Sequence, residues 1–434
     1  MSEPIPIWFG TSHVGDVLLD DEGVLGFKYT KTWIETPNAF PLSLGMPMEP
    51  IVYPPEVISP WLANLLPEEG QLSLLTRSLG LNRTDTLAIL DEIGDDTAGA
   101  LSFGTPSNRE VGSYTKLTEF YNIDDPEIAL EKHFEDLQRR PFLVGEEGVR
   151  LSLAGGQKKS ALAVLDSNGS PVLRLPEDGD VLAIPHRGAS STVILKPDNP
   201  VLPGAVENET YCLHLAQAVG ITSADAVVLS AGSRNAICVL RYDRVDQDGT
   251  LQRIHQEDFA QANGVPPEKK YERGTFTGID VATLLNTGRH LSPADALSLL
   301  NQFIFNILVG NTDAHAKNYS LLLPGGEGPY LAPLYDVLTV LSWPIVAQYF
   351  AQNIAGKKRK PGDITADHWD FIAKAVGYRP TDVRKQVKEL VRRIGANRVS
   401  VVEEVASFPG GVAGYVEEVA DLIQENALRI AGRL

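Results

Sequence analysis

The pattern of apolar and polar positions divides the chain into a strand-rich first half and a helical second half. Before about residue 245, apolar residues gather in short runs bounded by glycine or polar turns, as at 7–9, 160–165 and 236–242, which is typical of strands. Later they recur every three or four residues over 296–308 and 415–434, which predicts helices with a buried stripe. This order predicts an α+β fold.

Changes in this pattern predict four segments. A polar stretch spans 105–114, and a new run of strands begins at about residue 148. The sequence therefore predicts a small mixed α/β N-terminal subdomain (1–106), a linker with a helical connection (107–147), a strand-rich lobe (148–243) and a helical lobe (244–434). Within the first segment Glu92, Asp95 and Asp96 lie close together, and a solvated acidic turn is the interpretation that we favour.

The strand-rich lobe begins with a loop of glycine and lysine between two strand patterns, 149–153 and 160–165. Walker A and dinucleotide-binding glycine loops lead into a helix, whereas the loop that covers ATP phosphates in protein kinases joins two strands. Glycines let backbone amides approach phosphate oxygens, and the side chains add donors. Taken alone, the pattern favours a plain hairpin with solvated lysines. The loop residues are Ala154, Gly155, Gly156, Gln157, Lys158 and Lys159.

Lys196 ends the next strand pattern, as does the lysine of the third strand in kinases. Such a lysine reaches the α- and β-phosphates, and an edge-strand lysine in water is the alternative. Glu209, near the start of the following helix, could pair with Lys196 or could be an acid favoured by the helix dipole, and the sequence leaves both open. The strand that ends at Leu240, Arg241 and Tyr242 has the place of a kinase hinge, whose backbone groups would bind adenine.

Asp313 follows a long helix pattern, in the stretch Asn311-Thr312-Asp313-Ala314-His315-Ala316-Lys317-Asn318. An acid, an Asn five residues later and a second acid, Asp336, follow the order in which protein kinases present a catalytic base and two Mg²⁺ ligands. Asp313 would orient the attacking hydroxyl, while Asn318 and Asp336 would hold Mg²⁺, which prefers oxygen ligands. His315 and Lys317 could contact phosphate. Asp and Asn are also common in turns, so the consistent order of the parts is what favours ATP-dependent phosphoryl transfer.

Composition narrows the classes of function. The chain has 434 residues, enough for two or three domains, and a formal net charge of −18. That charge argues against strong nucleic-acid binding by the chain itself, because DNA binding draws its affinity from clustered cations. Cys212 and Cys238 stand in apolar runs without zinc spacing, so we expect buried free thiols in a reducing cytoplasm. Neither a signal peptide nor a membrane-spanning run is predicted.

The chain resembles the HipA-type serine/threonine kinases, which are toxins of type II toxin–antitoxin modules. The resemblance extends over nearly the whole sequence, and the Asp-x-His-Ala-Lys-Asn motif is specific. It rests on 151–159, 311–318 and 335–337, with further matches at 208–212, 241–244 and 427–434, and in the first segment at 40–44, 64–68 and 93–100.

The resemblance implies a two-lobed protein-kinase-like fold, with a β-rich N-lobe, a helical C-lobe and an extra N-terminal subdomain. It implies the use of ATP and Mg²⁺, with Asp313 as catalytic base and Tyr335 beside Asp336 in the ATP site. It also implies autophosphorylation of Ser152, at the start of the phosphate loop. A phosphate there would compete with ATP phosphates by charge and switch the kinase off.

The resemblance further implies a small DNA-binding antitoxin, HipB-like, through which the complex contacts operator DNA and represses its own operon. The implied protein substrate is an aminoacyl-tRNA synthetase, typically the glutamyl enzyme, whose inhibition slows translation and produces dormancy and drug tolerance. Gly156, Lys158 and Leu240 depart from the Ala, Glu and acid expected at their positions. A small-molecule kinase with the same ATP site, or a catalytically weak co-repressor subunit, remains an alternative.

Overall fold

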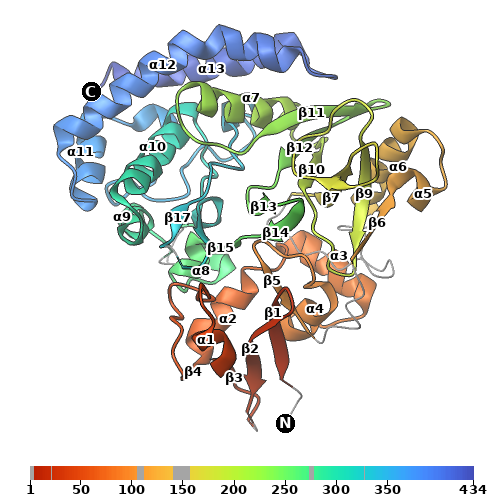
Figure 1. The fold of residues 1–434 in the computed structure, drawn as a ribbon. Helices are drawn as coiled ribbons and strands as arrows, with labels where there is room; N and C mark the ends of the chain where they lie inside the picture. Colours follow the sequence, from red (N-terminus) through yellow and green to blue (C-terminus); the bar gives the residue numbers. More distant parts are fainter. Residues whose placement is uncertain (1–3, 21, 105–111, 140–156, 273–277, 327) are drawn as a thin grey trace.

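Three parts are visible in the computed structural model: an N-terminal unit, a central sheet and a helical part (Figure 1). The structure describes residues 4–20, 22–104, 112–139, 157–272, 278–326 and 328–434. Within these ranges, none of the helices combines the length and apolar character needed to cross a bilayer.

The N-terminal unit is a five-stranded antiparallel sheet, in the order β4-β3-β2-β1-β5, with helices packed against it. The β2–β3 hairpin turns where Gly23 has φ +77° and the Asp20 carboxylate accepts the Val24 amide, as expected for an acidic turn closed by glycine. The elements are β1 (Ile5–Phe9), β2 (Ser12–Leu19), β3 (Leu25–Tyr29), α1 (Lys31–Glu35), β4 (Val52–Tyr53), α2 (Pro55–Ala63), α3 (Glu69–Leu79), α4 (Thr86–Ile93) and β5 (Leu101–Phe103).

The central sheet has the order β11-β12-β10-β7-β9-β6, and β8 pairs with β7. Part of the segment 107–147, for which the sequence predicts a linker with a helical connection, contributes β6 to this sheet as well as two helices. The elements are β6 (Ser113–Lys116), α5 (Leu117–Tyr121), α6 (Pro126–Arg139), β7 (Ser160–Leu165), β8 (Pro171–Val172), β9 (Val181–His186), β10 (Val193–Pro197), α7 (Ala205–Ala218), β11 (Ala226–Ala231) and β12 (Arg234–Leu240).

The helical part is built around α10, which the sequence marks at both ends. Ser292 accepts the Asp295 amide as N-cap, Pro293 occupies the first turn, and Gly310 ends the helix with φ +76°. The elements are β13 (Arg244–Gln247), β14 (Thr250–Arg253), β15 (His255–Asp258), α8 (Phe259–Ala262), α9 (Val281–Asn286), α10 (Pro293–Val309), β16 (Ser320–Leu323), β17 (Tyr330–Leu331), α11 (Ala366–Ala375), α12 (Pro380–Ala406) and α13 (Ala413–Ala431), with short 3₁₀ turns between them.

Two apolar cores place the central sheet between the other parts. One core joins α7 and strands β11 and β12 to helices α10 to α13. The other joins the N-terminal unit to the same sheet through side chains such as Leu162, Val193 and Leu195. Helix α7 therefore lies between the sheet and the long helices α12 and α13, as Figure 1 shows.

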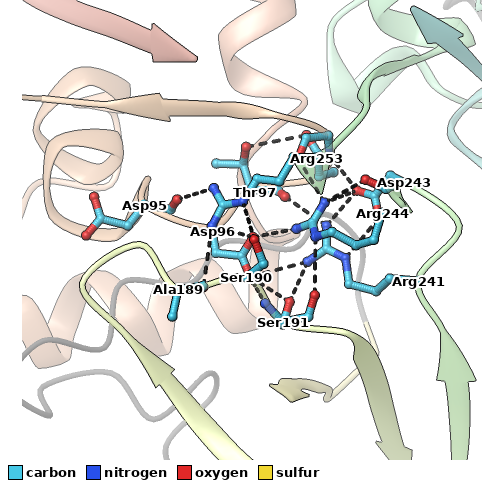
Figure 2. A network of polar contacts seen from close by, with 12 residues as sticks. Asp95, Asp96, Thr97, Ala189, Ser190, Ser191, Arg241, Asp243, Arg244 and Arg253 are labelled. Atoms are coloured by element: carbon cyan, nitrogen blue, oxygen red, sulfur yellow. Dashed lines mark hydrogen bonds and ion pairs between the residues drawn. The ribbon is translucent and has the colours of Figure 1, made fainter. Parts of the chain in front are cut away.

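A buried ion network joins the N-terminal unit to the end of β12 (Figure 2). The Asp96 carboxylate accepts a hydrogen bond from Arg244 at 2.5 Å and from the Ser191 hydroxyl at 2.6 Å, and it lies 3.5 Å from Arg241 and 3.3 Å from Arg253. The side chains of Asp96, Arg241 and Arg244 are at most 2% exposed. Burial alone would raise the pKa of Asp96, but the three arginine charges outweigh it and hold the pKa below its usual range.

Asp243 completes the network from the other side. It accepts two hydrogen bonds from Arg241, at 2.9 and 2.6 Å, and one from the Gly99 amide at 2.8 Å. The Arg241 guanidinium also donates to the Thr97 carbonyl, and that of Arg244 to the Gly99 carbonyl. The prediction of a solvated acidic turn is therefore wrong for Asp96, which is 1% exposed because arginines more than 140 residues away surround it.

A second contact joins the N-terminal unit to β15. The Glu257 carboxylate is fully buried and accepts the Leu44 amide at 2.8 Å, while the ring of His255 stacks on Phe40 and hydrogen-bonds the Leu42 carbonyl. Burial raises the pKa of Glu257 to about 8, so this side chain is held in its neutral form at physiological pH.

We expect Asp96→Asn to lower the free energy of unfolding by about 3–5 kcal/mol, because the buried side chains of Arg241 and Arg244 would have Asp243 as the one remaining acid of the network. Urea unfolding measures this loss. Asp16→Asn, which removes a partly exposed contact with His13, is the matched control and should cost at most about 1 kcal/mol. Equal small effects of the two substitutions would contradict the importance of the network.

We expect Glu257→Gln to remove a pH dependence of stability. The folded state keeps the Glu257 proton up to about pH 8, whereas the unfolded residue loses it near 4.5, so the folded state binds more protons in this window. Wild-type stability should therefore fall as pH rises from about 4.5 to 8, and the variant should lose that component. Melting curves at several pH values test this. Glu56 is exposed, so Glu56→Gln serves as the control and should keep the wild-type dependence of melting temperature on pH. If Glu257→Gln also kept that dependence, the assignment of the raised pKa to Glu257 would be wrong.

Candidate active site

A cavity of about 500 Å³ lies where the central sheet, the N-terminal unit and the loops after α10 meet. Its wall includes residues far apart in sequence, among them Lys159, Lys196, Tyr242, Asp313 and Asp336. The predicted positions Gln157, Leu240, Arg241, His315, Lys317 and Tyr335 also line it. Lys158 and Asn318 do not belong to this lining, and Ser152, Ala154, Gly155 and Gly156 fall outside the residues that the structure describes.

Lys196 is the centre of an ion triad in which the side chains of Lys196 and Glu209 are buried and that of Asp336 is partly exposed. Its ammonium nitrogen lies 2.7 Å from Glu209 Oε1 and 2.9 Å from Asp336 Oδ1. Burial would lower the pKa of Lys196, but the charges of Asp336 and Glu209 raise it above its usual value, so the side chain stays protonated. The structure thus decides the question that the sequence leaves open, because Glu209 pairs with Lys196 and is 1% exposed.

Asp336 is fixed in an unusual backbone conformation. Its φ of +54° lies in the left-handed region that non-glycine residues seldom adopt. The chain is anchored on both sides of it. Leu334 exchanges backbone hydrogen bonds with residues 222 and 224, and the Asn208 side chain of α7 bonds both the amide and the carbonyl of Thr339. These anchors hold the Asp336 carboxylate toward Lys196 despite the local strain.

Asn318 lies beside Asp336 and has the ligand chemistry of a magnesium site. Its Nδ2 donates to Asp336 Oδ2 at 2.7 Å, and its buried Oδ1 has no hydrogen-bond partner among the residues described. Two neighbouring oxygens of Asn and Asp fit Mg²⁺, whose remaining positions phosphate oxygens and water ordinarily fill. In the described part of the chain no group of three or more His, Cys, Asp or Glu side chains could hold a metal ion alone.

Asp313 is presented by the turn that ends α10. The Asn311 side chain accepts the Asp313 amide and donates to Asn306, and Asn426 of α13 caps the last carbonyls of the helix. The Asp313 carboxylate faces the cavity and accepts the Tyr271 hydroxyl at 2.5 Å. Asp313 is exposed, yet the protein around it still partly desolvates the carboxylate and raises its pKa, which the bond from Tyr271 partly offsets.

His315 and Lys317 follow on the same turn. Burial, followed by the charge of Lys270, lowers the pKa of His315 well below its usual value, so its ring is neutral. The ammonium of Lys317, for which the sequence predicts phosphate contact, donates to the carbonyl and the side-chain oxygen of Asn64, at 2.8 and 3.1 Å. Lys317 thus bonds Asn64 of the N-terminal unit. The residues next to Lys317 in the sequence do not predict this partner.

Two backbone amides of the predicted hinge segment already donate hydrogen bonds within the protein. The Leu240 amide donates to the Asp225 carbonyl and the Arg241 amide to the Thr192 carbonyl, while the Arg241 side chain belongs to the ion network. An adenine bound here would therefore use carbonyl groups or the Tyr242 amide rather than these two amides. Beside them the Tyr242 ring lies 5.5 Å from that of Tyr335, whose hydroxyl donates to the Lys317 carbonyl.

Lys159 supplies a further cation to the cavity. Burial and the nearby charge of Lys196 lower its pKa to about 8, while the Asp336 charge opposes the shift. A bound phosphate would add negative charge and favour the protonated amine. Lys159 and Lys196 therefore place two cations where the sequence predicts nucleotide phosphates.

Comparison with known proteins points to one family. The family models "HipA N-terminal domain" and "HipA-like C-terminal domain" match residues 5–104 and 151–398. The Sinorhizobium fredii protein Y4mE is 36% identical over 93% of this chain and 92% of its own. The serine/threonine-protein kinase toxin HipA of Shewanella oneidensis is 32% identical over 94% and 97%. A Shewanella oneidensis HipA, solved with HipB and operator DNA, superposes with a TM-score of 0.81 at 27% identity, over 99% of this chain and 97% of that one. The predicted two-lobed α+β fold with an extra N-terminal unit is confirmed.

Asn318→Ala should weaken Mg²⁺ binding by about tenfold or more, because it removes one oxygen ligand and the amide that orients Asp336. The measurement is the Mg²⁺ concentration needed for ATP to raise the melting temperature. Asn397→Ala on α12, whose amide bonds the Arg393 carbonyl, is the control and should leave that concentration unchanged. An unaltered Mg²⁺ requirement in Asn318→Ala would exclude Asn318 as a ligand.

Proposed function

The chain belongs to the HipA family of serine/threonine-protein kinase toxins, and from this membership we propose that it transfers the γ-phosphoryl group of ATP to a serine or threonine hydroxyl of a protein. The observation that carries the proposal is the ion triad of Lys196, Glu209 and Asp336, which lines the same cavity as Asp313. Phosphoryl transfer depends mainly on positioning and on charge stabilisation, and these residues supply both.

One set of residues would bind ATP, and another would activate the acceptor hydroxyl. Lys159 and Lys196 bind and orient the phosphates of ATP by charge. Asn318 and Asp336 would hold Mg²⁺, which when bound neutralises charge on the β- and γ-phosphates. Asp313 accepts the hydrogen bond of the attacking hydroxyl and takes its proton as the new O–P bond forms. The bond from the γ-phosphorus to the bridging oxygen breaks in the same transfer, and ADP leaves. Neutral His315 on the same turn adds no competing charge beside Asp313.

We propose a HipB-like antitoxin as partner, with operator DNA contacted mainly through it. A related HipA has been solved with HipB and its operator. The net charge of −18 supports a division of labour in which the antitoxin supplies the cations for DNA, and the pair then represses its own operon. The reduced thiols of Cys212 and Cys238, both buried, agree with action in the cytoplasm.

The proposed substrate is an aminoacyl-tRNA synthetase, and the glutamyl enzyme is the preferred candidate. Its phosphorylation would inhibit translation and promote dormancy and antibiotic tolerance. Self-inactivation by phosphorylation of Ser152 is the proposed off-switch. Ser152 lies five residues before Gln157, which lines the cavity, so a phosphate on it would be close in sequence to the cations that bind ATP.

Asp313→Asn should lower the transfer of radioactive phosphate from ATP to protein by about 10²-fold or more and should relieve growth arrest on expression, because the amide cannot take the acceptor proton. Phosphosite mass spectrometry after induction of both forms would report the substrate and Ser152 together. ATP with Mg²⁺ should still raise the melting temperature of the variant, which shows that the nucleotide site is intact. Labelling that survives the substitution would remove Asp313 as the base.

A further inference from the structure

The hydroxyl of Tyr271 is hydrogen-bonded to Asp313, whose carboxylate is the base in the proposed mechanism. It donates to Asp313 Oδ1 at 2.5 Å, and the Tyr271 ring packs edge-on against His315, with 5.0 Å between ring centroids. Both Tyr271 and Asp313 line the cavity that contains Lys196 and Asp336. A hydroxyl donor on this carboxylate is the contact that a phosphoryl acceptor has to make.

The neighbours of Tyr271 hold this contact in place from two sides. The Glu272 amide donates to the Ala351 carbonyl at 2.9 Å, and the Glu272 carboxylate accepts the Asn353 amide at 2.8 Å. On the other side, Lys270 forms an ion pair with Glu68 of the N-terminal unit at 2.5 Å. The phenol is therefore placed on Asp313 by the helical part and by the N-terminal unit together.

We propose that Tyr271 is a positioning residue of the acceptor site, whose phenol takes the place of the substrate hydroxyl on Asp313 until a serine or threonine displaces it. This inference rests on the proposed kinase function and extends it from the nucleotide to the acceptor side. Asp313 is exposed, and the phenol orients its carboxylate and occupies the oxygen that it bonds, Oδ1. The bond also lowers the pKa of Asp313 against the effect of desolvation, which favours the ionised base.

Occupation of this oxygen matters because water is the one acceptor that is always present. If water bound at the position of the phenol oxygen, Asp313 could take its proton while the water oxygen formed a bond to the γ-phosphorus. The bond from that phosphorus to the bridging oxygen would break, and ADP and inorganic phosphate would leave. Tyr271→Phe retains the ring against His315 but opens the space of one hydroxyl beside Asp313.

The test is the rate of ATP hydrolysis by the full chain with Mg²⁺ and no protein acceptor. We expect Tyr271→Phe to raise this rate by about tenfold, the range of one charge-assisted hydrogen bond, with the KM for ATP unchanged. Tyr415→Phe is the matched control, because it removes a hydroxyl that bonds the Pro203 carbonyl outside the lining of this cavity and should leave the rate as in the wild type. An equal or lower rate in Tyr271→Phe would overturn the proposal.

A double variant and a binding measurement separate this inference from the proposed function. The increase in the rate of ATP hydrolysis should disappear when Asp313→Asn is added to Tyr271→Phe. An increase that persists in the double variant would show that Tyr271 does not act through Asp313. If ATP with Mg²⁺ fails to raise the melting temperature of the wild type, the kinase assignment itself fails, and this inference with it. If ATP binds and hydrolysis does not rise in Tyr271→Phe, only the role of Tyr271 fails.

Discussion

The buried ion network around Asp96 is the interaction on which the other parts of the molecule depend. Removing five charged groups from water is costly, and their mutual attraction compensates only when every donor and acceptor is matched. Here the match requires the turn at residues 95–99, the end of β12 and Arg253 of β14 to meet in one geometry. The hinge side of the cavity is therefore held in place by contacts with the N-terminal unit.

The N-terminal unit is thus part of the active-site wall. Side chains of this unit contact residues of the cavity wall: Asp96 bonds Arg241 beside the hinge, Asn64 accepts the ammonium of Lys317, and Glu68 pairs with Lys270. The first contact lies on the proposed nucleotide side of the cavity, and the last lies next to Tyr271, which bonds the proposed base Asp313. A partner that shifts this unit would alter both ends of the proposed reaction at once.

In the candidate active site, burial and ion pairing have opposite effects on the charged side chains. Lys196 stays protonated between two carboxylates, whereas the pKa of Asp313 is raised by desolvation. Asp336 has a left-handed backbone conformation. Hydrogen bonds from α7 and from residues 222 and 224 fix the chain on either side of it. Strain at such a position persists only because surrounding contacts over-determine it. The same helix supplies Glu209, so the position of α7 sets both partners of Lys196.

The sequence by itself determined the order of strands and helices, the ends of α10, and the identities of Lys196, Asp313, Asn318 and Asp336 as candidate site residues. These features depend on spacing and capping between near neighbours, which local physics controls. Only the tertiary structure decided that Asp96 is buried, that Glu209 pairs with Lys196, that Lys317 bonds Asn64 and that Tyr271 lies on Asp313. The last two contacts join residues 253 and 42 positions apart, and no local pattern records which distant side chain will meet a given charge.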